Sequence, residues 1–588
     1  MTSVRQARVR APELQGRGWL NTGGRQLRLG ELRGRFVLLD FWTFCCINCL
    51  HVLDELRPLE EKYGDALVTV GVHSPKFPHE ADPEALAAAV ERYDVRHPVL
   101  DDPELLTWKQ YAARAWPTLA LIDPEGYLVA TAAGEGHVAG FDALLAELAA
   151  EHERRGTLRR GDGPYTPPPP AATALRFPGK VLALPTGTLL VSDSARHSLV
   201  ELAGDGETVL RRIGSGRRGL ADGGPADAEF SEPQGLALLP DGDVVVADTV
   251  NHALRRLRLA DGTVSTLVRA DQPLSPWDVA WYGDAVVVAA AGTHQLWRYD
   301  PATGAFMVLA GTTVEGLKDG PADGAWMAQP SGLATSADGT RLWIADAETS
   351  ALRYLEAGEL HTVAGQGLFD FGHRDGPAAG ALFQHPLGVA VLPDGSVAVC
   401  DTYNNAIRRY DLATGEVSTL ATGVAEPSGA TVLDGELVVV ESAAHRLSRP
   451  VAPGMSRQFA GAAQRVARPP TDLTPSAAGE VTLDVVFTPP PGQKLDDQYG
   501  PPTRVEVSST PAELLLDGAG AAADLSRRLR LNPDLTAGVL HVTAQAAVCD
   551  NDDEHAACHL IRQDWGVPVR LVAGGPSRLG LVLRGLDD

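Results

Sequence analysis

The spacing of hydrophobic residues changes twice along the chain, and the changes divide it into three regions. In residues 1–155, short apolar runs alternate with segments whose leucines recur every three or four positions, such as Leu50, Leu53 and Leu56. The runs are typical of buried strands and the leucine pattern of amphipathic helices. The pattern predicts strands at 36–41, 66–72, 98–100, 118–122 and 127–132, and helices at 50–63, 84–93, 105–113 and 141–153. We interpret this region as an α/β domain.

From about Phe177 to Pro450 the chain repeats a unit: Pro-x-Gly, then Pro-Asp-Gly, a valine-rich run, an aspartate and, seven residues later, an arginine. The unit is clearest from Pro233 to Arg255. Six copies start at Phe177, Pro233, Pro276, Pro330, Pro386 and Pro427. A period of about 40–50 residues is typical of four-stranded propeller blades, which bury their faces only against neighbouring blades. The repeats therefore predict a six-bladed β-propeller closed as a ring.

The repeated aspartate ends a strand in four copies, at Asp193, Asp248, Asp346 and Asp401. We interpret it as a structural acceptor of backbone N–H groups in the following turn.

Three longer connections carry Asp-Gly-(Gly)-Pro-Ala, at Asp222, Asp319 and Asp375. Loops on a rigid scaffold are common binding surfaces. The aromatic residues near these connections predict either a partner-binding or domain-docking surface or packing between blades; they are Phe230, Trp326, Phe369, Phe371 and Phe383.

In the third region apolar residues alternate with polar ones, as in Val481, Leu483 and Val485, and Pro and Gly punctuate short segments. This pattern favours a small β-sandwich. Four consecutive prolines at 167–170 mark an extended linker before the repeats. The predicted domains are 1–155, a linker at 156–174, the propeller at 175–454 and the sandwich at 455–588. The expected fold class is therefore multidomain, α/β followed by all-β.

The net charge of −24 argues against a nucleic-acid partner, because phosphate binding requires clustered Lys and Arg. Residues 1–20 hold no apolar segment of the kind a secretory signal requires, and no stretch approaches the roughly 20 apolar residues of a membrane span. We therefore expect a cytoplasmic protein without a membrane partner. Structural disulfides are rare in that compartment, and the six cysteines do not form a secreted disulfide framework.

Three cysteines follow the first predicted strand, at positions 45, 46 and 49. Because a helix N-terminus favours an anion, we expect Cys46 to be the nucleophilic thiolate and Cys49, one turn later, to resolve a mixed disulfide. Alternatives are half of a zinc site, for which no second Cys or His pair follows within the next hundred residues, and inert buried thiols. Cys45 is interpreted as a small core residue, with a third redox thiol as the alternative. His51 is interpreted as a solvated helix residue.

Asp40-Phe-Trp-x-x-x-Cys46-x-x-Cys49 resembles the active site of thioredoxin-like oxidoreductases, and Trp116-Pro117-Thr118 resembles their cis-proline loop. The resemblance implies that Cys46 is the nucleophile and Cys49 the resolving thiol. It also implies that Asp40 is the buried proton acceptor behind them and that Pro117 is the cis residue beside the disulfide. The order of the elements is similar to the redoxin branch of this fold.

A second cysteine pair, Cys549 and Cys558, flanks an acidic loop that contains His555. The pair can bridge the loop ends as a disulfide, and its layout resembles the amino-terminal redox domain of thiol:disulfide interchange proteins. An auxiliary redox role, a metal site that uses His555 or His559, and reduced structural thiols remain open.

The repeats resemble NHL repeats, and the whole order resembles the NHL repeat-containing protein 2 family. The function that we expect is thiol–disulfide exchange with protein thiols or disulfides, with the propeller and sandwich as docking modules. An interaction scaffold or redox sensor without turnover is the alternative. The Cys46–Cys49 disulfide is then the redox group, and no other cofactor and no metal is expected.

Overall fold

The computed structural model describes residues 9–167, 173–451, 471–475, 479–489, 493–495, 501–550, 558–573 and 575–583. The chain forms two compact units, Met1–Gly461 and Ala462–Asp588. The two regions predicted as an α/β domain and a propeller pack together in the first unit. None of the described helices has the length and apolar character needed to cross a bilayer.

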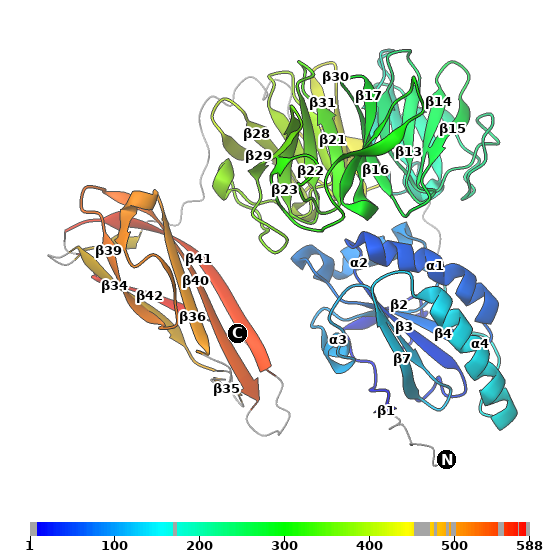
Figure 1. The fold of residues 1–588 in the computed structure, drawn as a ribbon, viewed down its shortest axis with the longest axis horizontal. Coiled ribbons are helices and arrows are strands. Elements are labelled where there is room, and N and C mark those ends of the chain that lie inside the picture. The colour runs from blue at the N-terminus through cyan, green and yellow to red at the C-terminus, as the bar shows by residue number, and fades with distance from the viewer. Residues whose placement is uncertain are drawn as a thin grey trace. The chain divides into compact units, whose positions relative to one another are not determined.

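The first region is thioredoxin-like, with a seven-stranded mixed sheet in the order β1-β7-β6-β3-β4-β5-β2 (Figure 1). Its elements are β1 (Val9–Arg10), β2 (Gly18–Leu20), β3 (Phe36–Trp42), α1 (Ile47–Tyr63), β4 (Leu67–His73), η1 (Pro78–Ala81), α2 (Pro83–Arg92), β5 (Val99–Asp101), α3 (Leu106–Gln110), β6 (Thr118–Ile122), β7 (Tyr127–Ala133) and α4 (Val138–Arg155). Strand β3 runs parallel to β4 and antiparallel to β6 at the centre of the sheet.

Strand β3 is buried at every position because both faces of the sheet are covered. On one face Leu38 packs with Val52 and Leu56 of α1 and with Leu145 of α4. On the other face Leu39 and Phe41 pack in a second cluster. Because side chains alternate along a strand, Asp40 faces the same side as Leu38, toward α1. The end of β3 thus directs both Asp40 and the following cysteines to one place.

The second region is propeller-like and contains six antiparallel sheets (Figure 1). Their strands are β8 (Val181–Ala183), β9 (Leu189–Asp193), β10 (Ser198–Leu202) and β11 (Val209–Ile213); β12 (Pro233–Leu238), β13 (Val244–Asp248), β14 (Ala253–Arg258) and β15 (Thr263–Arg269); β16 (Pro276–Tyr282), β17 (Ala285–Ala290), β18 (Gln295–Tyr299) and β19 (Phe306–Ala310); β20 (Gly320–Pro321), β21 (Pro330–Thr335), β22 (Arg341–Asp346), β23 (Ala351–Glu356) and β24 (Glu359–Ala364); β25 (Gly376–Pro377), β26 (Gly388–Val391), β27 (Val397–Asp401), β28 (Ala406–Asp411) and β29 (Glu416–Thr422); β30 (Pro427–Leu433), β31 (Glu436–Glu441) and β32 (Arg446–Ser448).

The glycine of the repeated Pro-x-Gly is explained by close approach between the innermost strands of neighbouring sheets. A Cβ added at Gly332 would lie 2.8 Å from the Cα of Gly388, and one added at Gly388 would lie 2.9 Å from the Cα of Gly429. Two repeats have charged residues at this position instead, and these two residues, Lys180 and Asp278, form a buried ion pair of 3.3 Å.

The repeated aspartate and arginine form a buried network, as in the fourth sheet. Arg353 is fully buried and donates to the carboxylates of Asp346 at 2.9 Å and Asp319 at 2.9 Å. Asp346 also accepts the backbone N–H of Ala328 at 2.8 Å. Equivalent contacts join Arg255 to Asp248 and Asp222, and Arg408 to Asp401 and Asp375. The aspartates of the three long connections are therefore structural clamps.

Replacing Arg353 with methionine is expected to lower the free energy of unfolding by about 3–5 kcal/mol, because Asp346 would remain buried without its cation. The shift in the midpoint of urea unfolding measures this loss. Arg341→Met is the matched control: Arg341 pairs with Glu356 at 2.9 Å, but both side chains are about one third exposed, so a loss below about 1 kcal/mol is expected. Equal effects of the two substitutions would contradict the clamp role.

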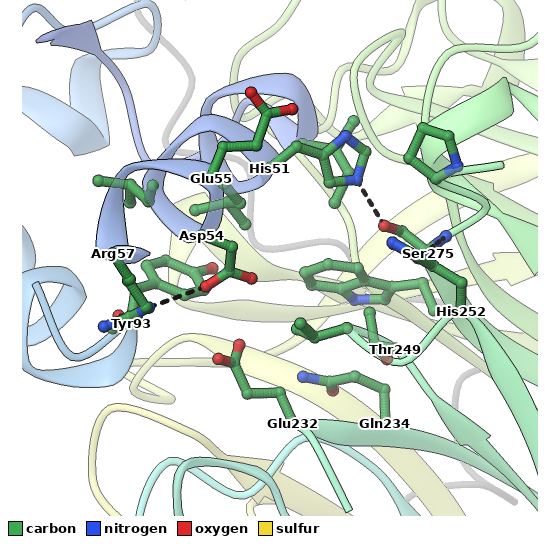
Figure 2. A pocket seen from close by; sticks show the side chains of 16 residues that line it. His51, Asp54, Glu55, Arg57, Tyr93, Glu232, Gln234, Thr249, His252 and Ser275 are labelled. Carbon is green, nitrogen blue, oxygen red and sulfur yellow. Dashed lines mark hydrogen bonds and ion pairs between the residues drawn. The ribbon is translucent and has the colours of Figure 1, made fainter. Parts of the chain in front are cut away.

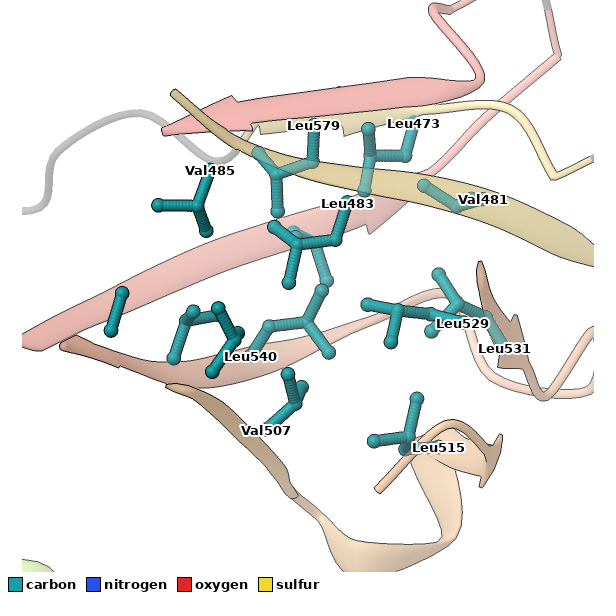
Figure 3. Packing of buried hydrophobic residues seen from close by; sticks show 14 of the residues in the cluster. Leu473, Val481, Leu483, Val485, Val507, Leu515, Leu529, Leu531, Leu540 and Leu579 are labelled. Atoms are coloured by element: carbon teal, nitrogen blue, oxygen red, sulfur yellow. The ribbon is translucent and has the colours of Figure 1, made fainter. Parts of the chain in front are cut away.

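The second unit contains two sheets, β33-β41-β40-β36-β38 with β35 paired to β40, and β37-β39-β34-β42. The strands are β33 (Thr471–Leu473), β34 (Glu480–Phe487), β35 (Gln493–Leu495), β36 (Thr503–Thr510), β37 (Leu515–Asp517), β38 (Gly520–Ala522), β39 (Ser526–Leu531), β40 (Ala537–Asp550), β41 (Cys558–Leu571) and β42 (Arg578–Leu583). Leu483 and Leu529 of one sheet and Val507 and Leu540 of the other belong to one hydrophobic cluster (Figure 3). The alternating residues of the sequence thus provide a core between the two sheets.

Candidate active site

Cys46 stands at the boundary between the loop that follows β3 and helix α1. It is the residue that precedes the first helical residue, and its backbone is extended, with φ −85° and ψ 112°. Its carbonyl accepts the N–H groups of Cys49 at 3.0 Å and Leu50 at 3.2 Å. The side chain of Cys46 is partly exposed, whereas Cys45 and Cys49 are buried. Of the three neighbouring thiols, Cys46 is therefore the one accessible to a second molecule.

Cys49 lies directly behind Cys46 and is fully buried. Burial, a hydrogen bond with the Cys46 thiol and the nearby carboxyl of Asp40 raise the pKa of Cys49 well above its ordinary value. Burial and the carboxylates of Glu348 and Glu80 likewise raise the pKa of Cys45. Cys49 therefore reacts only when a neighbouring group accepts its proton.

Asp40 is the carboxyl behind this pair and has no exposed surface. Within the part of the chain that the structure describes, neither of its oxygens has a hydrogen-bond partner. Burial raises the pKa of Asp40 to about 7, while His97 acts to lower it and Glu60 to raise it. A carboxyl with a pKa near neutrality is suited both to accept and to return a proton.

A His–Glu pair lies behind Asp40. Gly71 is opposite Asp40 in the β3–β4 register, and a Cβ at Gly71 would lie 3.0 Å from Nε2 of His97. Nδ1 of His97 contacts Oε1 of Glu60 at 2.7 Å, and the Glu60 side chain is about one fifth exposed. The pair therefore extends from the surroundings of Asp40 toward solvent.

The peptide bond between Trp116 and Pro117 is cis, as the resemblance implies. Pro117 directly precedes β6, which pairs with β3. Trp116 and Cys46 both pack against the same hydrophobic cluster that contains Cys45 and Cys49. The structure therefore brings Asp40, Cys46, Cys49 and the cis-proline loop to one end of the sheet.

Glu80, which is buried, organises the loop before Cys46. Its carboxylate accepts hydrogen bonds from Thr43 Oγ1 at 2.6 Å and from the backbone N–H groups of Cys45, Lys76 and Phe77 at 2.9 Å each. The Glu80 carboxylate thus joins the loop that contains Cys45 to Lys76 and Phe77, which precede η1.

The propeller-like region contacts the start of α1, the helix that carries Cys49. The side-chain oxygen of Gln329 accepts the N–H of Ile47 at 2.7 Å, and Lys76 forms an ion pair with the buried Glu348. The N–H groups of a first helical turn have no partner within the helix. Here Gln329 of the propeller-like region supplies a partner for one of these N–H groups.

Aromatic residues extend this contact. Tyr403 of the propeller-like region packs edge-on against Phe44 and Phe77, at centroid distances of 5.7 Å each, and Phe371 lies 4.7 Å from Phe77. Phe371 therefore serves domain docking. Phe230 and Phe383 are fully buried in the cores between sheets, and Trp326 and Phe369 are 36% and 76% exposed.

Ion pairs and hydrogen bonds also connect the thioredoxin-like region to the propeller-like region. Arg218 binds both oxygens of Asp54 at 2.7 Å, and Glu426 binds Arg92 and His79. His51 is not solvated as predicted: its side chain is 11% exposed and lies between Glu135 and Ser275, at 2.7 Å from each. The prediction was wrong because the helix face that carries His51 faces the propeller-like region.

A cavity of about 320 Å³ lies between α1 and the propeller-like region, lined by sixteen side chains including His51, Asp54, Glu232 and Gln234 (Figure 2). Cys46 and Cys49 are not among the lining residues, although Ile47 and Leu50 of the same helix are.

Among the described residues, one group brings potential metal ligands within 4.8 Å of one another: Asp123, Glu125 and His152. Asp123 follows β6, at the end of the sheet away from Cys46. The carboxylate of Asp123 accepts the N–H groups of Glu125 and Tyr127 at 2.9 Å each, and Glu125 pairs with Arg155, so these groups already serve a turn. The cysteines 45, 46 and 49 are not part of this group.

The backbone register places Cys549 opposite Cys558 at the end of the β40–β41 pair. The loop with His555, and the side chains of Cys549, Cys558 and His559, lie outside the described residues. The auxiliary redox role of this pair stays a prediction.

Sequence reasoning missed His97 and Glu60 behind Asp40, and it missed Gln329 and Glu348, which contact Ile47 and Lys76. Neither pair lies in a recognisable motif. The glycine at position 71, opposite Asp40 in a strand of otherwise larger residues, is the one local signal of close packing there.

Comparison with known families gives two matches. A thioredoxin-like family model matches residues 34–128, and an NHL repeat model matches residues 230–257 and 383–410. The first match contains Asp40, Cys46, Cys49 and Pro117. The second contains the repeated aspartate and arginine of two clamps, Asp248 with Arg255 and Asp401 with Arg408, but not the connection aspartates.

Several curated proteins are similar to this chain. Protein SUPPRESSOR OF QUENCHING 1, chloroplastic, of Arabidopsis thaliana is 38% identical over 438 residues, which are 68% of this chain and 41% of that protein. NHL repeat-containing protein 2 of Homo sapiens is 32% identical over 461 residues, 69% of this chain and 63% of that protein. Thiol-disulfide oxidoreductase YkuV of Bacillus subtilis is 25% identical over 143 residues, 24% of this chain and 95% of that protein. The chain thus spans less than two thirds of the first two relatives.

Proposed function

This chain is a homologue of the proteins named NHL repeat-containing protein 2, and from that premise we propose that it exchanges thiols and disulfides through Cys46 and Cys49. The observation that carries the proposal is the arrangement of three groups: a partly exposed thiol at a helix start, a buried thiol in contact with it, and a buried carboxyl behind both.

In the reducing direction, the thiolate of Cys46 attacks one sulfur of a substrate disulfide, and the other substrate sulfur leaves as a thiolate. Asp40 then accepts the proton of Cys49. The Cys49 thiolate attacks the sulfur of Cys46 and displaces the second substrate thiol, so that two electrons pass to the substrate and a Cys46–Cys49 disulfide remains. The oxidising direction is the reverse, and no cofactor other than this disulfide takes part.

We take the propeller-like region to be a closed six-bladed ring that selects the partner. Contacts between successive innermost strands support closure: β8 with β12, β12 with β16, β16 with β21, β21 with β26, β26 with β30, and β30 with β8. Tyr403 and Gln329 of the propeller-like region lie near Cys46 and the first residue of α1. A substrate disulfide must approach Cys46 from this side. The second unit is taken to be a β-sandwich that docks or binds partners.

The alternative is an interaction scaffold or redox sensor without turnover. The coverage of the helix start by Gln329 favours it, because part of the surface around Cys46 is already occupied.

A redox titration of the Cys46/Cys49 pair in glutathione buffers tests the two possibilities. Alkylation of free thiols followed by mass measurement is expected to give a single two-electron midpoint within the range of about −270 to −120 mV known for related pairs. Cys46→Ser is the control and should abolish the transition. If the pair does not close in the wild-type chain, the exchange function is wrong and the scaffold function takes its place.

A further inference from the structure

The cavity between α1 and the propeller-like region has the size and position of a small-molecule site. Its volume of about 320 Å³ lies at the lower end of the range of about 300–1,000 Å³ typical of ligand pockets. Such pockets occur preferentially where two domains meet. Glu55 and Pro273, which line the cavity and are exposed, mark where it reaches solvent.

The walls of the cavity are largely apolar. Leu50 and Leu53 of α1 form one side, and Val250 of the propeller-like region contributes to the other. Two large aromatic side chains, Tyr93 and Trp277, also line it. These residues suit a ligand with an apolar or aromatic body.

Polar contacts on two sides join the walls of the cavity. The bidentate ion pair between Arg218 and Asp54 crosses the junction, and so does the hydrogen bond of 2.7 Å between His51 and Ser275. Figure 2 shows Asp54 and Ser275 on opposite sides of the space. The cavity is therefore framed by specific contacts between the two regions.

Two polar side chains enter the cavity with hydrogen-bonding capacity to spare. Figure 2 shows Glu232 and Gln234 reaching into it from the propeller-like region. Glu232 forms an ion pair of 3.5 Å with Arg218, and among the residues that the structure describes its carboxylate and the Gln234 side-chain amide make no hydrogen bond. Buried or half-buried polar groups are normally paired, so a ligand with hydrogen-bond donors fits here.

The charge of the lining selects the sign of the ligand. Asp54, Glu55 and Glu232 are acidic, and Arg57 is the basic residue among the lining side chains. Burial, and the nearby His51, lower the pKa of His252 to about 4, so His252 is uncharged at neutral pH. Asp54 is already paired with Arg218 and Arg57, so Glu55 and Glu232 are the carboxylates that face a ligand. Burial raises the pKa of Glu232 to about 7, and a bound cation favours its ionised form, whereas an anion opposes it.

We propose that this cavity binds a small organic cation, an amine carried on an apolar or aromatic body. The Glu232 carboxylate and the Gln234 amide oxygen accept hydrogen bonds from the ammonium group, and Tyr93 and Trp277 contact the body of the ligand. Aromatic faces add a favourable interaction with the cation. Binding of the cation does not depend on thiol exchange, so this proposal is tested independently of the function proposed above.

Isothermal titration calorimetry of the full chain with matched probes tests this site. Each set has the same body and three charge forms: tryptamine, tryptophol and indole-3-propionate, and likewise 4-phenylbutylamine, 4-phenylbutanol and 4-phenylbutyrate. At least one amine is expected to bind about tenfold or more tightly than its alcohol, and the carboxylates are expected not to bind. Equal binding of the charge forms, or no binding of either amine at about 1 mM, would overturn the proposal.

Glu232→Gln keeps the size of the side chain and removes its charge. It should weaken amine binding at least about tenfold and leave alcohol binding unchanged. Glu359→Gln is the matched control, because Glu359 is exposed on β24 and does not line the cavity, and its amine affinity should equal that of the wild type. Gln234→Met provides a second variant, with reduced amine affinity expected. Wild-type amine affinity in folded Glu232→Gln chain would contradict the site.

Discussion

A chain with Cys49 replaced by serine is expected to stop after the first chemical step. Cys46 still attacks a disulfide, but a serine hydroxyl does not displace it, so the mixed disulfide accumulates. Multiple turnover should fall by at least about 10³-fold, as when one member of a catalytic unit is removed. The burial of Cys45 makes it a poor substitute for the missing thiol.

The stoichiometry of reaction with 5,5′-dithiobis(2-nitrobenzoate) measures this effect. In the wild type, the attack of Cys46 releases one 2-nitro-5-thiobenzoate and the attack of Cys49 releases a second. Cys49→Ser should release only the first and retain the adduct by mass. The nitrothiobenzoate released by Cys46→Ser comes from the other thiols, and this amount is subtracted from the release by the wild type and by Cys49→Ser. Wild-type release from Cys49→Ser would show that Cys49 is not the resolving thiol.

Replacing Asp40 with asparagine is expected to slow closure of the Cys46–Cys49 disulfide by about 10²-fold at neutral pH, because general-base catalysis of Cys49 is lost. Cys49 is buried and its pKa is raised, so it depends on a proton acceptor. In the wild type the closure rate should rise with pH around 7, where Asp40 ionises. The second phase of nitrothiobenzoate release, followed by stopped flow, reports this step.

The same substitution is expected to stabilise the protein at alkaline pH. Asp40 has a pKa of about 7 in the folded state, well above the value of about 3.9 in an unfolded chain. The folded state therefore retains a proton that the unfolded state loses, and stability decreases as pH rises from about 4 to 7. At pH 8 this penalty is up to about 4 kcal/mol. Asp40→Asn should remove the penalty at pH 8 and change little below about pH 4.

Urea unfolding at the two pH values measures this difference. A variant that is slower but more stable separates a catalytic role from a structural one, because loss of a structural contact would reduce both. If Asp40→Asn is less stable than the wild type at pH 8, Asp40 is not held as a buried acid.

Two histidine substitutions give the matched comparison for the group behind Asp40. His97 acts to lower the pKa of Asp40, so His97→Gln should shift the pH midpoint of closure upward. His152 is also a buried histidine, but it lies beside Asp123 at the end of the sheet away from Cys46, where it contacts Thr157 and Phe36. His152→Gln should leave the midpoint unchanged.

Much of the fold was predictable because local spacing reflects local structure. The run from Phe36 to Phe41 indicated the central strand, and the leucines from Leu50 to Leu59 indicated the helix that follows. The repeats indicated propeller-like sheets because each copy carries its own strands and turn signals. The environment of His51 was not predictable. A polar residue on a helix is predicted to be solvated, and the sequence does not show that the propeller-like region covers it.

The sequence by itself determined the chemistry and its local placement. Three local patterns can be identified without the tertiary structure. They are a cysteine pair one helical turn apart, an aspartate six residues before the first cysteine, and a proline in a later strand connection. Only the tertiary structure decided what surrounds them. Ile47 and Gln329 are 282 positions apart, and Lys76 and Glu348 are 272 apart. Contacts at such separation follow from the shapes of two folded surfaces, and no periodicity along the chain encodes them.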